Sequence, residues 1–105
     1  MTGRAQSNEN CEYLSVRFSR DVHARYKEWA RQSNVSIRVV HDAVFRTYRP
    51  QFNTDIGVPE EHQIISVAVP KLVLEDIEER RPPHMSPGTC VRQWLTEGID
   101  NYPTN

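Results

Sequence analysis

Cysteine, glycine and long apolar stretches are scarce in this chain. The 105 residues include two cysteines and four glycines, and no apolar run approaches the roughly 18 residues that cross a membrane. Cys11 and Cys90 are far apart in the sequence, and in a reducing compartment we expect two free thiols rather than a disulfide. Residues 1–10 are polar and lack the apolar segment of a secretory signal, which favours a cytoplasmic protein without a membrane partner.

Patterns typical of catalysis are also missing. The chain has no glycine-rich phosphate loop, nucleophile elbow or paired-carboxylate pattern. His62, His84 and Cys90 do not have the tight spacing of metal-ligand pairs. His23 and His41 are expected on the polar faces or edges of helices, in contact with solvent. We therefore predict no enzyme activity, no cofactor, no metal and no small-molecule substrate.

An excess of one charge over the whole chain is absent too, since the net charge is −1 at pH 7. The two halves nevertheless differ in charge. Residues 1–57 carry nine Lys/Arg against six Asp/Glu, whereas residues 58–105 carry four against eight. A surface that faces phosphates is therefore expected to depend on the first half. The alternative is an ordinary scatter of charges over solvated faces.

The sequence does contain a pattern that begins with one strand and two helices. Residues 13–18 alternate apolar and polar side chains, which predicts a strand. Ser19 can begin a helix, and Asn34 stands where a left-handed residue would end it. Ser36 can then cap a second helix, which Pro50 ends.

The same order returns in the second half of the chain. Another alternating strand ends at Val69, 51 residues after Phe18, and Pro70 suits the first turn of the helix that follows. Ser86 can cap the last helix, 50 residues after Ser36. A pattern that recurs at nearly constant spacing indicates a duplicated structural unit.

A single copy of this unit has no partner for its strand and no second layer to cover its apolar stripe. Two copies solve both problems. We therefore expect a mainly α-helical fold with a two-stranded antiparallel β-ribbon, made of two tandem units in an intramolecular pseudo-dimer. The predicted parts are a flexible N-terminal arm at 1–12, a first unit at 13–49, a linker at 50–63 and a second unit at 64–102. The alternative is a plain helical domain in which the alternating runs are buried turns.

The predicted core takes the apolar positions of the strands and of the helix stripes. Its members are Leu14, Val16, Phe18, Val22, Trp29, Val40, Val44, Ile65, Val67, Val69, Ile77, Cys90, Trp94 and Leu95.

These residues resemble the ribbon-helix-helix superfamily, also called the Arc/MetJ type. The segments that carry the resemblance are Leu-Ser-Val-Arg-Phe-Ser at 14–19, the turn at 34–36, Ile-Ser-Val-Ala-Val-Pro at 65–70 and the cap at Ser86. Two units in one chain, with the stretch 48–57 between them, resemble the TraY-type accessory proteins of relaxosomes. The resemblance implies a protein that recognises duplex DNA in a sequence-specific way with its ribbon, in the nucleoid, as a transcriptional regulator or repressor.

Successive side chains of a strand point to opposite faces. If Leu14, Val16 and Phe18 point inward, the residues between them therefore point outward. The outward positions match the base-contacting positions of the superfamily, and they are Tyr13, Ser15, Arg17, Ile64, Ser66 and Ala68. Arg17 suits the O6 and N7 acceptors of guanine. The outward residues of the second strand carry no charge. We therefore expect the first strand to read bases through polar contacts and the second through shape and thymine methyl groups.

The resemblance also implies that the N-termini of the second helix of each unit bind phosphates through free N–H groups and the positive end of the helix dipole. With nearby cations added, the predicted phosphate-contacting residues are Arg20, Ser36, Ile37, Arg38, Lys71, Ser86, Gly88 and Thr89. Pro87 has no N–H and removes one donor from the second site. As capping residues alone, Ser36 and Ser86 would need no functional explanation.

Three other functions remain open from the sequence. The chain could be a conjugation accessory protein that marks and bends a DNA site. It could be an antitoxin, although it has only a short segment after its last predicted helix. It could also be a protein-interaction scaffold that has lost DNA binding. In the DNA-binding alternatives, copies could associate on adjacent sites.

Overall fold

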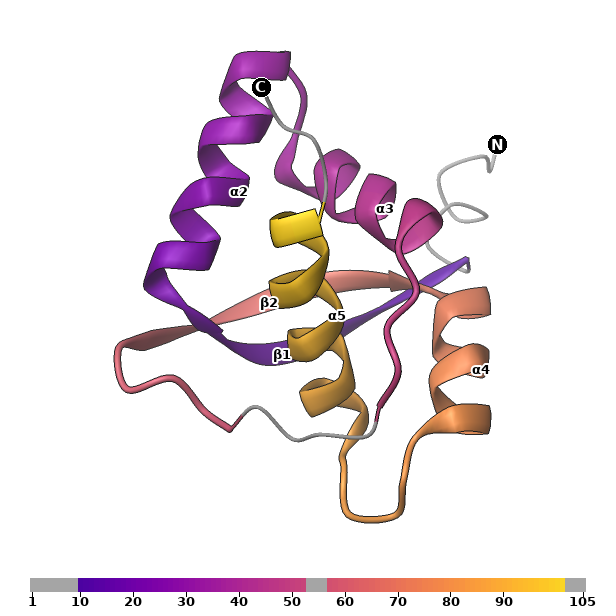
Figure 1. Ribbon diagram of the computed structural model, residues 1–105. Coiled ribbons are helices and arrows are strands. Elements are labelled where there is room, and N and C mark those ends of the chain that lie inside the picture. The colour runs from indigo at the N-terminus through magenta and orange to yellow at the C-terminus, as the bar shows by residue number, and fades with distance from the viewer. Residues whose placement is uncertain (1–9, 53–56, 102–105) are drawn as a thin grey trace.

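Figure 1 presents the computed structural model, which describes residues 10–52 and 57–101. The order strand, helix, helix occurs twice in these residues. The elements are β1 (Cys11–Ser19), α2 (Arg20–Ser33), α3 (Ile37–Thr47), β2 (His62–Pro70), α4 (Lys71–Arg80) and α5 (Pro87–Asn101). The expectation of a mainly helical fold with a two-stranded antiparallel ribbon is confirmed. The predicted linker at 50–63 overlaps the start of β2, and residues 53–56 lie outside the described ranges.

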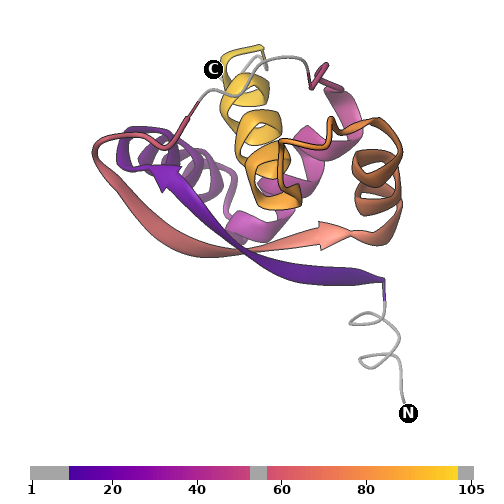
Figure 2. The same cartoon turned by 90° about the horizontal axis from the view of Figure 1, so that it is seen from below.

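The two strands pair along their whole length. Ser15 lies opposite Ser66, and the two are separated by 51 residues, the same spacing as the sequence repeat. The pairing is therefore centred on two corresponding positions. Figure 2 shows the ribbon along one side of the molecule, with the four helices on the other side. One face of the ribbon packs on the helices, and the opposite face is left uncovered by them.

Local signals explain where the first helices begin and end. The Ser19 side chain accepts a hydrogen bond from the Val22 N–H at 3.3 Å and so satisfies one of the free donors at the start of α2. Asn34 ends α2 with a left-handed φ of 58°, and its N–H bonds back to the last turn. Ser36 precedes α3 without a capping bond from its side chain. Pro70 likewise precedes α4 without one.

The two strand–helix–helix units interlock. Helix α3 of the first unit packs on β2, and α5 of the second packs on β1. The Tyr26 hydroxyl of α2 donates a buried hydrogen bond to the Leu95 carbonyl of α5 at 2.6 Å. The core therefore belongs to both units at once, and removing either unit would expose the apolar face of the other.

The predicted core is buried, except that Leu14, Trp29 and Ile65 are only partly buried against it. The core also contains side chains outside the predicted set, namely Tyr26, Ala30, Phe45, Phe52, Met85, Val91 and Ile99. Phe52 and Met85 come from connecting segments, where no periodicity marks them. Cys11 and Cys90 are both buried and form no disulfide, as predicted.

The prediction that both helical histidines face solvent is wrong. His41 is 3% exposed and packs edge-on against the Tyr26 ring, with the ring centroids 4.9 Å apart. His23 is half-buried, and its ring lies 6.2 Å from that of Phe18. The helical spacing places both histidines at the edge of a polar face. That edge is covered because α3 packs against α2.

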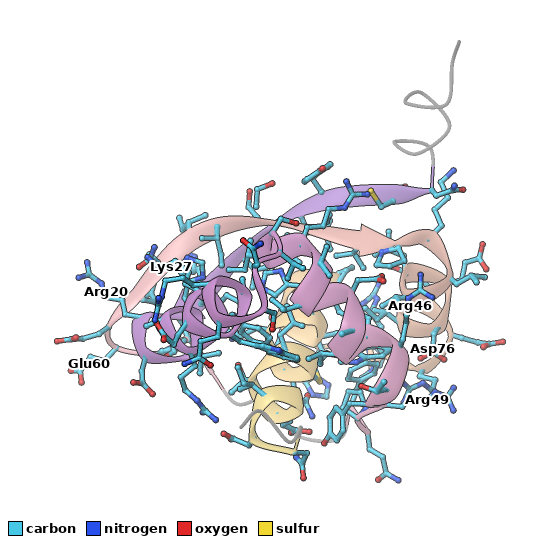
Figure 3. All side chains as sticks on the ribbon, turned by 90° about the horizontal axis from the view of Figure 1, so that it is seen from above. Arg20, Lys27, Arg46, Arg49, Glu60 and Asp76 are labelled. Carbon is cyan, nitrogen blue, oxygen red and sulfur yellow. The ribbon has the colours of Figure 1, made fainter. Side chains whose placement is uncertain are left out.

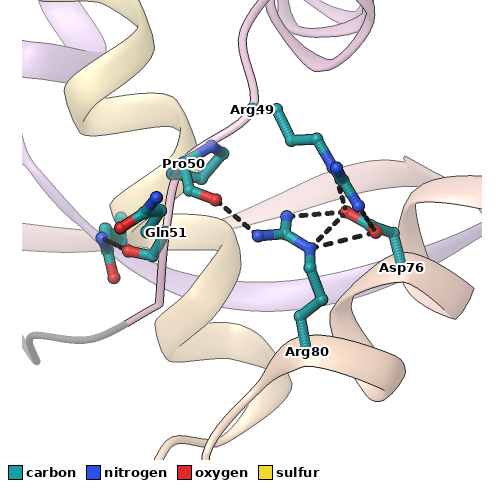
Figure 4. Close-up of polar contacts among 6 residues, drawn as sticks. Arg49, Pro50, Gln51, Asp76 and Arg80 are labelled. Atoms are coloured by element: carbon teal, nitrogen blue, oxygen red, sulfur yellow. Dashed lines mark hydrogen bonds and ion pairs between the residues drawn. The ribbon is translucent and has the colours of Figure 1, made fainter.

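The segment that leaves α3 is fixed to the second unit (Figure 4). The Arg80 side chain donates to the Pro50 carbonyl at 2.6 Å, and its guanidinium lies 4.6 Å from the centroid of the Phe52 ring. Asp76 accepts hydrogen bonds from both Arg80 and Arg49. These bonds, those from Arg80 first, lower the pKa of Asp76 to about 2. Residues 49–52 are thus held against the second unit by charge-assisted and apolar contacts.

Replacing Asp76 with asparagine is expected to destabilise the fold by about 1–2 kcal/mol at neutral pH, because the two guanidinium groups lose their charged acceptor. Urea unfolding of D76N and of the wild type measures the difference. Glu75→Gln is the matched control, since Glu75 is an exposed carboxylate on the same helix. Equal stability of D76N and E75Q would contradict a stabilising role for this network.

None of the helices in the described ranges has the length and apolar character needed to cross a bilayer.

Candidate nucleic-acid interface

The structure places the six predicted base-contacting residues on one face of the ribbon. Alternation along each strand turns every second residue to this face. The antiparallel register then aligns them as three cross-strand pairs, which are Tyr13 with Ala68, Ser15 with Ser66, and Arg17 with Ile64. The ribbon face formed by these six residues is called the outer face below, and the ribbon itself lies along one side of the molecule with the helices on the other (Figure 2).

Five of these residues present their side chains to solvent. Tyr13 is 57% exposed and Ile64 is 61% exposed, and both are large side chains. Ser15, Arg17 and Ser66 are exposed as well.

Ala68 differs from the other five, because it is only 9% exposed. It lines a groove of about 490 Å³ together with Cys11, Ser36 and Arg38, where the start of α3 approaches the end of β2. Ala68 therefore occupies an outer-face position but offers little surface to a ligand.

The predicted phosphate-contacting residues lie at the starts of the four described helices. Arg20 and Lys71 are the first residues of α2 and α4, and both are exposed. Arg20 borders a shallow depression that Glu60, Glu61 and His62 also line. Figure 3 shows Arg20 and Glu60 at the same end of the molecule. These acidic neighbours weaken the positive field of Arg20.

The start of α3 offers an open set of donors. Ser36 makes no capping bond with its side chain, and the first N–H groups of any α-helix lack intrahelical acceptors. Ile37 and Arg38 follow directly. The Arg38 guanidinium donates to the Cys11 sulfur at 3.3 Å, which holds this cation beside the start of β1. The helix start, its dipole and the Arg38 charge together favour an anion here.

The start of α5 is more closed. The Thr89 N–H donates to the Ser86 hydroxyl at 3.2 Å, and the two hydroxyl groups lie 3.0 Å apart. Pro87 contributes no N–H. Gly88 lies against the middle of β1, since a side chain there would begin 3.6 Å from the Ser15 carbonyl oxygen. This helix start therefore approaches the centre of the ribbon but has fewer donors available than α3.

Ion pairs neutralise part of the positive charge in the first half of the chain. Arg31 pairs with Glu28, Arg46 with Asp42, Arg25 with Asp100, and Arg49 with Asp76. Among the ion pairs of the described residues, none involves Arg17, Arg20 or Arg38. Arg17 on the outer face, and Arg20 and Arg38 at helix starts, thus keep their charge outside the ion pairs of the described residues. Pairs four residues apart, such as Asp42 and Arg46, could have been inferred from sequence, but the long-range pairs could not.

Residues 10–52 and 57–101 contain no group of three histidine, cysteine or acidic side chains that could hold a metal ion. Comparison with family models, with curated proteins and with solved structures gives no match.

Proposed function

We propose that this chain binds duplex DNA in a sequence-specific way, as a transcriptional regulator, by inserting the outer face of its ribbon into the major groove. We further propose that its two strand–helix–helix units are a fused pair of ribbon-helix-helix units that act as a pseudo-dimer. The observation that carries both proposals is the strand register. It aligns the residues predicted to contact bases as cross-strand pairs centred on Ser15 and Ser66, and five of the six are exposed.

The dimensions and chemistry of the ribbon suit this role. The major groove is about 12 Å wide and admits a two-stranded ribbon, whereas the minor groove is about 6 Å wide. Arg17 supplies two parallel donors on the outer face, and both serines can donate or accept. Helix starts beside the ribbon offer N–H groups and positive dipole ends to the phosphates that flank the groove.

The test is binding of the full chain to random and to selected duplexes over a series of salt concentrations. If Arg20, Arg38 and Lys71, at the starts of α2, α3 and α4, each neutralise one phosphate, the logarithm of the affinity should fall against the logarithm of the salt concentration with a slope of roughly −3. Folded protein that retains no duplex even at low salt would contradict DNA binding and favour a scaffold function.

Arg17→Ala is expected to reduce discrimination between the selected and random duplexes by about 5-fold to 150-fold, because a bidentate arginine–guanine contact contributes about 1–3 kcal/mol to base choice. Arg20→Ala is expected to weaken binding to all duplexes and to reduce the salt slope by about 1. Arg31→Ala is the control, because Arg31 lies in the last turn of α2 and pairs with Glu28. Equal discrimination by R17A and R31A would exclude base reading by Arg17.

A further inference from the structure

We propose that the DNA target is asymmetric, with a guanine next to a thymine at one end of the ribbon and no corresponding guanine at the other end. This inference rests on the proposed function and specifies the ligand of the same site. It differs from the sequence-based expectation, which assigned polar contacts to one strand and methyl contacts to the other. In the strand register, by contrast, the two ends of the outer face differ, because each end combines one residue from each strand.

One end of the outer face combines Arg17 with Ile64. They are direct cross-strand partners, and such partners have Cβ atoms about 4.5–5.5 Å apart. Base pairs are stacked about 3.4 Å apart, so both side chains face the same or adjacent base pairs. Arg17 matches the O6 and N7 atoms of guanine, and the apolar Ile64 matches the methyl group of thymine, the apolar group of the major-groove edge. This end therefore selects guanine beside thymine.

The other end combines Tyr13 with Ala68. Ala68 is 9% exposed and ends in a single methyl group, so Tyr13, which is 57% exposed, dominates this end. Its phenol provides a ring face and one hydroxyl, and neither reproduces the paired donors of an arginine. Between the ends, Ser15 faces Ser66, so the centre treats both DNA strands alike. The asymmetry thus arises from the two outer pairs.

The first experiment selects binding duplexes from a randomised library with wild-type protein and sequences the products. We expect a consensus without two-fold symmetry in which guanine and thymine are neighbours at one end. On the selected duplex, Ile64→Ala should reduce the preference for thymine over uracil by about threefold to fivefold, since one apolar methyl contact is lost. The guanine preference should remain in I64A and disappear in R17A.

The second experiment makes the outer face symmetric. Ile64 and Ala68 lie 51 residues after Tyr13 and Arg17, so the double substitution Ile64→Tyr and Ala68→Arg gives both strands the same outward residues. The groove beside Ala68 leaves room for a longer side chain. Selection with this double variant, after its cooperative thermal unfolding has been verified, should return a palindromic consensus with guanine at both ends.

The outcomes separate the inference from the proposed function. A palindromic consensus for the wild type would overturn the asymmetric target while DNA binding stands. So would a result in which I64A loses the thymine preference at one end of the site and R17A loses the guanine preference at the other end. Absence of any enriched duplex with folded wild-type protein would overturn both. If the double variant does not fold, the comparison of I64A with R17A still decides the matter, because both replaced side chains are exposed.

Discussion

Gly98→Ala is expected to destabilise the protein by about 2–3 kcal/mol, although alanine is the better helix former by about 1 kcal/mol. A Cβ atom at this position would lie 2.3 Å from Cγ1 of Val44 and 3.5 Å from Cδ2 of Tyr48. Helix α5 crosses α3 at this point. Val44 is completely buried and, as a β-branched residue in a helix, has essentially one favourable rotamer. The clash therefore displaces a helix rather than a flexible side-chain end, and overpacking exceeds the gain in helix propensity.

Urea unfolding followed by tryptophan fluorescence measures this effect. Gly88→Ala is the matched control, because its Cβ would meet its nearest neighbour at an ordinary 3.6 Å. That variant is expected to keep or slightly raise the wild-type stability. The double variant Val44→Ala, Gly98→Ala should be more stable than the sum of its two single effects predicts, since the smaller side chain relieves the clash. A G98A protein as stable as the wild type would mean that α3 and α5 do not cross this closely.

Gly98 shows which part of the fold a sequence can predict. The strands, the Ser19 cap and the left-handed Asn34 depend on neighbours within a few residues, and the sequence predicts them. The overall pairing of the strands follows from alternation together with the repeat. The glycine at a helix crossing, in contrast, depends on two helices that are distant in sequence. The same holds for Phe52, whose burial depends on Arg80 and Trp94.

The candidate site divides in the same way. Alternation alone predicts which strand residues share the outer face. The low exposure of Ala68 could not be predicted, because it depends on the start of α3, which is distant in sequence and lines the same groove. The division of the outer face into an Arg17 end and a Tyr13 end required the strand register, since alternation does not tell which residues of two strands lie opposite each other.

Acid is expected to destabilise the fold through His41, by about 3 kcal/mol between pH 6.5 and pH 4. Burial first, and the nearby His23 second, lower the pKa of His41 from 6.5 to about 4. The Nε2 atom has no hydrogen-bond partner among the described residues, so no acceptor stabilises a proton on it. Burial, followed by the charge of Lys27, also lowers the pKa of His23.

The direction follows from proton linkage. Above pH 6.5, His41 is neutral in both the folded and the unfolded chain, and it adds no pH dependence. As the pH falls from 6.5 towards 4, the unfolded chain binds a proton that the folded chain does not, so the free energy of unfolding decreases. Each unit of pKa difference corresponds to about 1.4 kcal/mol, which gives about 3 kcal/mol over this window. The contribution of Asp76 is lost in a separate window, as the pH falls from 3.8 towards 2.

Urea unfolding at a series of pH values from about 7.5 to about 4 measures the effect, and His41→Phe is the decisive variant. Phenylalanine retains a ring beside Phe18 and Tyr26 but cannot take up a proton, so most of the slope between pH 6.5 and 4 should disappear, leaving the smaller part that His23 contributes. His84→Gln is the control, because His84 is exposed. An unchanged slope in H41F would assign the acid sensitivity to other groups. Since His41 contacts Tyr26, and Tyr26 donates to Leu95 of the second unit, protonation of His41 should loosen the packing that joins the two units.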